Sequence, residues 1–312
     1  MTATLTLPLS AHELCEAVRH ARPFNPARLD RVLRLDAGRG LAEVQASASW
    51  ASLAAYLRPG TPDVAALWRD APSIGESVAT NAAGPDGRPT VAHVEGLVLV
   101  TPDGELRRVN RSANPELFAL VVGGQGLFGA PYSVTLKLES LARAAAEAAP
   151  CAELSLPGAC TATRALQLLV PPESREAFLA EARSRCEVWR VNIEAVEARR
   201  TLAESETLLR WARREYAAIT LRLAEPPALG GAVRATQLRR ELIDCSIAHS
   251  GSFPIACTAD ATRAQVARCY PELERFLADK RRLDPADRLM TPWYRHHRSL
   301  VGRESCAVRW ER

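Results

Sequence analysis

The chain has 312 residues, enough for two domains or one large one, each with its own hydrophobic core. Hydrophobic residues make up 47% and charged residues 24%, which is ordinary for a soluble globular protein and argues against disorder. The formal net charge is only +4, and basic residues are scattered among acids, as in RRTLAESETLLRWARREY. Because nucleic-acid binding usually needs a concentrated basic face, we expect no nucleic-acid partner. Nearly all basic residues are Arg, and Ala is abundant, which indicates a bacterial, GC-rich genome.

Cysteine usage and the N-terminus indicate the compartment. No two of the eight cysteines form a CxxC pair, and we expect reduced, mostly buried thiols and no metal site. The start, MTATLTLPLSAHELCEAV, lacks a basic segment and an uninterrupted apolar run, so it does not have the form of a signal peptide. No window of the chain is apolar enough for a membrane helix. We therefore expect a cytoplasmic protein without a membrane span.

The first part of the chain predicts a strand, a helix and a hairpin in that order. Alternation in residues 4–9 predicts a short strand, and Ser10 with Glu13 three residues later has the form of a capping box at a helix start. Two strands then flank a Gly-containing turn at residues 37–40, and a helix begins near Ser49.

Residues 73–87 read SIGESVATNAAGPDG, and almost none of their side chains is large enough to build a core. Glycine lacks the Cβ that would block a ligand, while Ser, Thr and Asn can turn polar groups toward phosphates or sugars. The run is therefore either a surface loop or a segment that wraps a polar ligand.

The next elements complete an α+β pattern in the first half. Two alternating runs flank the turn Asp103-Gly104 and predict a pair of strands. Residues 114–120 predict a short helix that leads into a Gly cluster, and residues 132–138 alternate as a strand. We expect ligand-binding loops between these regular elements.

A change to Ala-rich composition places a domain boundary near residue 145. Beyond it, SREAFLAEARSRCEVWRVNIEAVE predicts a helix and then a strand, and LLRWARREYAAITLRL predicts strands. The segment ATQLRRELIDCSIAHSG predicts an amphipathic helix with Leu238, Leu242 and Ile243 on one face. The tail holds two helical pieces punctuated by Pro271 and Pro285.

The order of these pieces resembles the FAD-binding domain of the vanillyl-alcohol oxidase / p-cresol methylhydroxylase (PCMH-type) family. The likeness rests on the strand pair before SWASLAAYL, on SIGESVATNAAG, on LVLVTPDGEL and on NPELFALVVGGQGLFGAPYSVTLKL. It continues to the tail, whose YP-x-L-x-x-F-x-x-x-K-x-x-x-DP segment is similar to the end of FAD-dependent oxidases. The resemblance implies an α+β protein with an FAD-binding domain at residues 1–145, a substrate (cap) domain at 146–265, and a C-terminal helical tail at 266–312 that packs back on the first domain.

The resemblance also implies that the small-residue run passes along the pyrophosphate and ribityl chain of FAD and donates backbone N–H groups to it. The Gly cluster at 123–126 would supply tight turns beside the cofactor, although ordinary turn chemistry also explains it. The implied cofactor-binding residues are Ser73, Ile74, Gly75, Ser77, Val78, Thr80, Asn81, Gly84, Gly124, Gly126, Gly129 and Ala130.

The chain also departs from the family. The Gly-rich GxGHS-type loop, which clamps the pyrophosphate and often holds the flavin-linked histidine, is missing between the first helix and the hairpin. His20 lacks that Gly context and is interpreted as a partly exposed histidine at a helix end. Glu76 replaces a Gly and would repel a diphosphate unless it turns outward, and Pro131 removes one backbone donor. We therefore expect FAD to be noncovalent.

The substrate side is altered as well. Similar oxidases have Tyr and His side chains after the segment LIDCSIAHSGSF, where this chain has PIACTAD. Cys257 in that segment is interpreted as a buried neutral thiol. Flavin oxidases need a base within hydrogen-bond reach of the substrate hydroxyl. The candidates are Tyr294, His296 and His297, and the alternative is that they belong to a solvated basic tail.

These observations favour an FAD-dependent oxidoreductase that oxidises an alcohol, a sugar lactone or a similar small hydroxyl substrate by hydride transfer to the flavin. The alternative is a degraded or truncated flavoprotein-like scaffold with weak or no FAD binding. A third hypothesis, an anionic-partner module based on Arg content, conflicts with the scattered acids. The sequence predicts neither the substrate, nor the electron acceptor, nor the oligomeric state.

Overall fold

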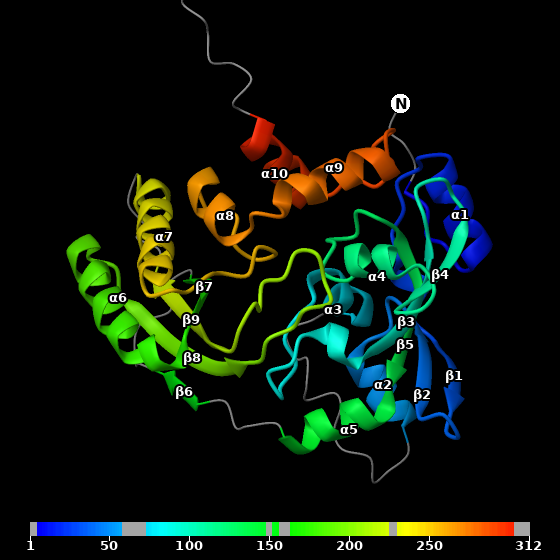
Figure 1. The fold of residues 1–312 in the computed structure, drawn as a ribbon, viewed down its shortest axis with the longest axis horizontal. Coiled ribbons are helices and arrows are strands. Elements are labelled where there is room, and N and C mark those ends of the chain that lie inside the picture. Colours follow the sequence, from blue (N-terminus) through cyan, green and yellow to red (C-terminus); the bar gives the residue numbers. More distant parts are fainter. Residues whose placement is uncertain (1–4, 58–72, 148–151, 156–162, 225–229, 303–312) are drawn as a thin grey trace, which may run out of the picture. The chain divides into compact units, whose positions relative to one another are not determined.

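The computed structural model describes residues 5–57, 73–147, 152–155, 163–224 and 230–302. The chain divides into two compact units, each made of segments that are distant in sequence. Unit 1 comprises residues 1–149, 204–210 and 275–294, and unit 2 comprises residues 150–203, 211–274 and 295–312. Each unit has one antiparallel sheet with helices, so the predicted α+β class is confirmed (Figure 1). The predicted domains 1–145, 146–265 and 266–312 stay predictions.

The sheet of unit 1 has five strands in the order β1-β2-β5-β3-β4. They are β1 (Val32–Asp36), β2 (Leu41–Gln45), β3 (Val94–Val100), β4 (Leu106–Asn110) and β5 (Ala130–Lys137). Both predicted hairpins are confirmed, and each turn contains a glycine at positive φ, Gly40 at +64° and Gly104 at +83°. Side chains at these turns would be strained, because L residues rarely adopt this conformation.

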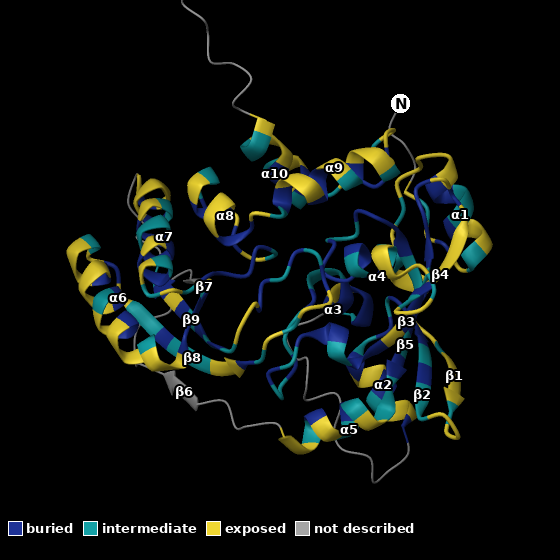
Figure 2. Ribbon diagram, viewed as in Figure 1, coloured by how far each residue is buried: buried dark blue, intermediate teal, exposed yellow. Residues whose placement is uncertain are grey.

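One face of this sheet is apolar across four strands. Val44 pairs with Val134, Val134 with Leu97, and Leu97 with Val109, and all four side chains are at most 1% exposed. In Figure 2 buried positions of these strands are dark blue, while most of β4 is exposed. This register stabilises the sheet. Alternate residues of a strand point to the same face, so the paired apolar side chains form a continuous row and bury apolar area between neighbouring strands.

Helices α1 (Ala11–Arg19), α2 (Trp50–Tyr56), α3 (Ile74–Thr80), α4 (Pro115–Val121) and α5 (Leu138–Glu147) belong to unit 1. The Ser10 side chain caps α1 as predicted, but the Glu13 carboxylate accepts from the Leu9 N–H and not from Ser10. The predicted strand at residues 4–9 is wrong over its described part, residues 5–9. In this segment Thr6 forms an isolated parallel bridge with Phe24, and the pairing does not extend into a strand.

Unit 2 has a four-stranded sheet in the order β6-β8-β9-β7. Its strands are β6 (Ala152–Ser155), β7 (Thr163–Val170), β8 (Ile193–Thr201) and β9 (Tyr216–Ala224), and its helices include α6 (Arg175–Trp189), α7 (Gly231–Ala248) and α8 (Arg263–Cys269). The predicted apolar face of α7 is confirmed, since Leu238, Leu242 and Ile243 are fully buried. Two further helices, α9 (Leu273–Leu283) and α10 (Pro292–Gly302), each contain residues of both units.

Two other expectations about the second half need correction. The segment LLRWARREYAAITLRL forms a strand only from Tyr216 onward, because residues 204–210 leave unit 2 and join unit 1. Cys257 is exposed and not buried, whereas Cys186, Cys245 and Cys269 are buried; Cys151, Cys160 and Cys306 lie outside the described residues. Within the described ranges, no helix combines the length and the apolar character needed to cross a membrane.

Candidate functional site

The first half of the small-residue run is helical. Residues 74–80 form α3, with Ser73 as N-cap accepting a hydrogen bond from the Glu76 N–H at 3.1 Å, and Asn81 ends the helix at a left-handed φ of 51°. The prediction of a loop is therefore wrong for these seven residues. Position 75 requires glycine, since a Cβ there would lie 2.6 Å from the Ala46 carbonyl oxygen. The sequence signal for this helix is Ser73 at the N-cap position, but the loop-like composition of the run obscured it.

Polar groups at the start of α3 contact the protein itself. The backbone N–H groups of Ile74 and Gly75 donate to the carbonyls of Ala48 and Ala46 at 2.9 and 2.7 Å. The Ser77 hydroxyl accepts from the Trp50 indole N–H at 2.9 Å. A cofactor phosphate at this end of the helix would compete with these bonds, so the N–H groups of residues 74 and 75 do not fit the expected pyrophosphate contact.

Solvent exposure separates the predicted cofactor residues into two groups. Ser73, Thr80 and Gly126 are half-buried and accessible, and the other nine are buried. Glu76 is exposed on α3, so its carboxylate is hydrated and its repulsion of a nearby diphosphate is weakened by solvent. A ligand on this surface would reach the Thr80 side chain, whose hydroxyl donates to the Glu76 carbonyl at 2.8 Å.

The structure brings the small-residue run and the Gly cluster together. The Gly123 N–H donates to the Val78 carbonyl, and the Gln125 N–H donates to the Ala79 carbonyl, both at 2.9 Å. The Gln125 side-chain amide also donates to Ala79 at 3.3 Å. These bonds tie the segment after α4 to the last turn of α3, two regions that are distant in sequence. The predicted cofactor residues on both segments therefore lie in one place.

The glycines of the cluster are required for different physical reasons. A Cβ on Gly124 would lie 1.9 Å from the Leu120 carbonyl oxygen, and one on Gly129 would lie 2.2 Å from a Leu99 methyl carbon, so both allow close packing within the protein. Gly126 has φ of +72°, and a Cβ there would meet nothing within 4 Å. The backbone at Gly126 therefore faces open space that a ligand can enter. Pro131 is paired at an irregularity between β3 and β5, which is where a central strand tolerates proline.

The segment at residues 204–210 borders this site, and the sequence did not indicate it. The Asn81 side chain accepts from the Val91 N–H at 2.9 Å and donates to a Glu204 carboxylate oxygen at 3.5 Å. Glu204 also accepts from the backbone N–H of Glu206 at 2.7 Å. The contact between Asn81 and Glu204 depends on the tertiary fold. Sequence patterns relate residues that are close in the chain, so they could not indicate this contact.

Arg111 holds the same segment from the other side. Its guanidinium pairs with the Glu206 carboxylate, donates to the carbonyls of Val91 and Val94 at 2.9 and 2.7 Å, and lies 5.1 Å from the centre of the Phe118 ring. The guanidinium thus connects four parts of unit 1 and fixes the border of the site.

The three predicted catalytic candidates lie on α10. Tyr294 is fully buried, and the Lys280 ammonium lies 5.5 Å from the centre of its ring. His297 is also buried, and its ring centre lies 4.9 Å from that of the half-buried His296. Burial leaves His296 as the most accessible of the three. Their catalytic role stays a prediction.

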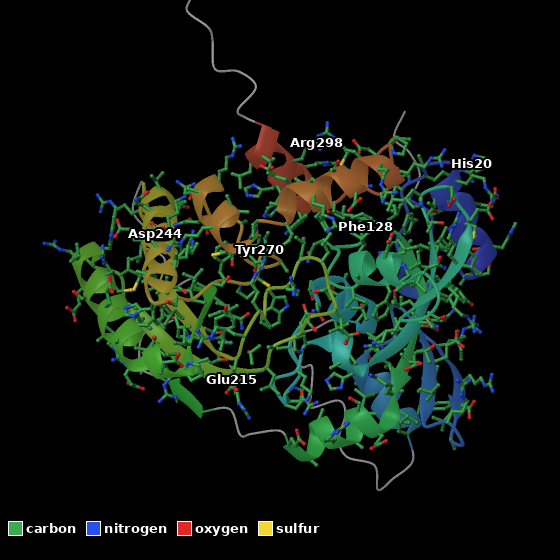
Figure 3. All side chains as sticks on the ribbon, viewed as in Figure 1. His20, Phe128, Glu215, Asp244, Tyr270 and Arg298 are labelled. Atoms are coloured by element: carbon green, nitrogen blue, oxygen red, sulfur yellow. The ribbon has the colours of Figure 1, made fainter. Side chains whose placement is uncertain are left out.

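His20 agrees with its interpretation as a histidine at a helix end. It is exposed at the C-cap of α1, and its Nε2 lies 3.2 Å from a Glu16 carboxylate oxygen. Figure 3 shows His20 at the outer edge of the structure, on α1. A flavin-linking role for it has no support in this geometry.

A cavity of about 170 Å³ in unit 1 lies on the polar face of the sheet and is separate from the predicted cofactor residues. Its walls carry mixed charges, including Arg34, Arg108, Glu43 and Glu95. None of the twelve predicted cofactor residues lines it.

Comparison with known proteins finds a likeness for part of unit 1. No curated protein matches the chain. A family model described as "FAD binding domain" matches residues 23–110, a range that contains the β1-β2 hairpin, α3 and the β3-β4 hairpin. Residues 23–110 are thus similar to an FAD-binding domain, a likeness that suggests a flavin-dependent oxidoreductase.

Proposed function

We propose that unit 1 binds FAD noncovalently and that the protein oxidises an alcohol, a sugar lactone or a similar hydroxyl substrate. The observation that carries the proposal is the pair of bonds from Gly123 and Gln125 to the last turn of α3. They bring together the segments that carry the accessible residues Thr80 and Gly126, of which Thr80 lies within the matched range 23–110. FAD, when bound, accepts a hydride from the substrate.

The residues that hold the cofactor in this proposal are those on α3, on the turn after it and in the Gly cluster. Thr80 and Gly126 contact it from accessible positions, while the buried members, such as Gly75 and Gly124, shape the backbone beneath it. Asn81 orders the turn through its bond to the Val91 N–H. Because the N–H groups of Ile74 and Gly75 are already engaged, phosphate charge is offset elsewhere on the site.

The noncovalent mode follows from the chain's own residues. The GxGHS-type histidine expected in the family is missing from the sequence, and His20, the histidine nearest that position, is exposed beside Glu16. Residues 146–265 would supply the substrate domain and residues 266–312 the returning tail. His296, the half-buried candidate, would be the base that accepts the substrate's hydroxyl proton, with Tyr294 and His297 as further candidates.

A scaffold that has lost FAD binding is the second candidate, favoured by the internal bonds at the start of α3. One experiment separates the two. Purified protein is incubated with FAD, desalted, and then mixed without oxygen with a panel of alcohols and lactones. Retained flavin that is bleached by a substrate supports the oxidoreductase, and retained flavin must appear in the supernatant after acid precipitation. Protein that never retains flavin supports the scaffold.

A further inference from the structure

Three side chains with metal-binding atoms converge in unit 2, whereas the proposed flavin site belongs to unit 1. Cys245 and His249 are one helical turn apart, so they lie on the same face of the α7 end, and Glu181 faces them from α6. Their ligand atoms all lie within 4.8 Å of one another, and the His249 Nε2 lies 3.1 Å from a Glu181 carboxylate oxygen. Cys245 is buried, and the other two are half-buried.

The helices that present these side chains pack side by side and are held at both ends (Figure 1). The Trp189 indole at the end of α6 donates to the Glu241 carboxylate of α7 at 2.9 Å. At the end of α7, the Ser246 hydroxyl donates to the Leu169 carbonyl at 3.0 Å, and a Cβ on Gly251 would lie 2.1 Å from that same oxygen. The three side chains therefore project from fixed elements, which favours a preformed site.

The Glu181 carboxylate holds the cluster together by accepting hydrogen bonds from His249 and Arg185. Hydrogen bonds from His249 and then from Arg185 lower the pKa of Glu181 below its ordinary value. Burial, together with the Glu181 charge, raises the pKa of the Cys245 thiol to about 12. A carboxylate, a thiol and an imidazole thus face one another within 4.8 Å, and metal binding to such a set releases the thiol proton.

We propose that Glu181, Cys245 and His249 bind one divalent transition-metal ion of the zinc type. Thiolate, imidazole and carboxylate are ligands that Zn²⁺ takes in proteins, and bonds of about 2.0–2.3 Å place ligand atoms roughly 3–4 Å apart. In the structure the ligand atoms all lie within 4.8 Å of one another, so binding an ion would draw them closer together. Arg185, 3.1 Å from the second Glu181 oxygen, orients the carboxylate, and water completes the coordination.

The binding step balances in charge. The Cys245 thiol loses its proton to solvent, His249 keeps one proton on Nδ1 and binds through Nε2, and Glu181 is already ionised. One thiolate and one carboxylate then neutralise the two charges of the ion. The expectation of no metal site rested on the absence of a CxxC pair, and the sequence did not show that Glu181 lies beside Cys245 and His249. The contact between α6 and α7 supplies the third ligand.

The test uses the full chain, reduced, with Co²⁺ as the spectroscopic probe. We expect one Co²⁺ per chain with a sulfur-to-cobalt charge-transfer band, displaced by Zn²⁺. Cys245→Ser should abolish the band, whereas the matched control Cys186→Ser, at a buried cysteine of α6 outside the cluster, should retain it. Wild-type protein without the band, or a band that persists in Cys245→Ser, overturns the proposal.

A second variant, which is similar in shape to the wild type and is checked for folding, tests Glu181 as a ligand. Glu181→Gln keeps the size of the side chain and its hydrogen bonds to neutral partners but removes the charge. We expect Co²⁺ affinity to fall by at least about tenfold, the loss typical of a changed ligand environment. Thermal unfolding followed by circular dichroism confirms that the variant is folded. Unchanged affinity in folded Glu181→Gln overturns the assignment of Glu181 as a ligand.

Discussion

Gly123 donates its backbone N–H to the carbonyl oxygen of Val78 at 2.9 Å, and this bond joins two segments that the sequence assigned separately to one ligand. Gly123 has φ of +75°, and a Cβ on it would lie 3.3 Å from the Asn81 Cβ. The left-handed turn at Asn81 and the left-handed turn at Gly123 therefore pack against each other. Any ligand held by α3 also meets the Gly cluster.

Gly126 provides the sharpest test of where the ligand lies. Gly126→Asn fills open space but costs little backbone strain, because Asn tolerates positive φ. We expect FAD affinity to fall at least tenfold, about 1.4 kcal/mol, as measured by fluorescence titration. The matched control is Gly40→Asn in the β1-β2 turn, where φ is +64° and a Cβ also meets nothing within 4 Å. Equal affinities in the two variants would place the ligand elsewhere.

Thr80 tests the same surface from α3. Thr80→Arg puts a long charged side chain into the proposed FAD site beside α3, and we expect loss of FAD retention after desalting. Thr80→Ser keeps the hydroxyl that donates to the Glu76 carbonyl, so FAD affinity should stay within about threefold, less than 1 kcal/mol, of wild type. If Thr80→Arg is folded and keeps FAD, α3 is not part of the site.

Lys280 and Asp284 form a buried ion pair on α9 and the turn after it, with side-chain exposures of 0% and 1%. Asp284→Ala leaves the ammonium without its counter-charge, so we expect the free energy of unfolding to fall by about 3–5 kcal/mol. Asp279→Ala is the control on the same helix, because its partners Arg275 and Arg282 are exposed, and we expect a loss of at most about 1 kcal/mol. Denaturant unfolding measures the loss of unfolding free energy in both variants. Similar losses would show that the buried Lys280–Asp284 pair contributes no more to stability than an exposed ion pair.

The same carboxylate predicts a pH dependence. Burial alone would raise the pKa of Asp284, but hydrogen bonds from the Leu289 N–H, Lys280 and the Arg288 N–H outweigh it, and the pKa lies below its ordinary value of 3.8. Its contribution to stability is therefore complete above pH 3.8 and is lost as the pH falls through the lower folded value. Wild-type unfolding free energy should drop on acidification in this window, and Asp284→Asn should drop less. Parallel curves would refute this account.

Local signals made part of the fold predictable. The turns at residues 37–40 and 103–104 were predicted correctly because glycine at positive φ is a property of the turn itself. The capped start of α1 and the apolar face of α7 are likewise local patterns. Each depends on residues within a few positions of one another, which a single sequence displays.

Tertiary contacts decided the rest. Residues 74–80 form a helix because Ser73 caps it and Gly75 fits against the Ala46 carbonyl, a contact that composition does not display. The segment 204–210 joins unit 1 through the Arg111–Glu206 pair, although the predicted boundary assigned it to the second domain. The position of Glu204 beside Asn81 could not be predicted for the same reason.

Flavin absorbance of the purified protein tests the central claim most directly. The visible spectrum is recorded before and after incubation with FAD and desalting, with the Thr80→Arg protein as the reference for nonspecific retention. The account predicts twin flavin bands that stay with wild-type protein at about one FAD per chain and are lost in the variant. A folded wild-type protein that stays colourless after incubation would contradict it, and the likeness of residues 23–110 to an FAD-binding domain would then be one of fold without FAD binding.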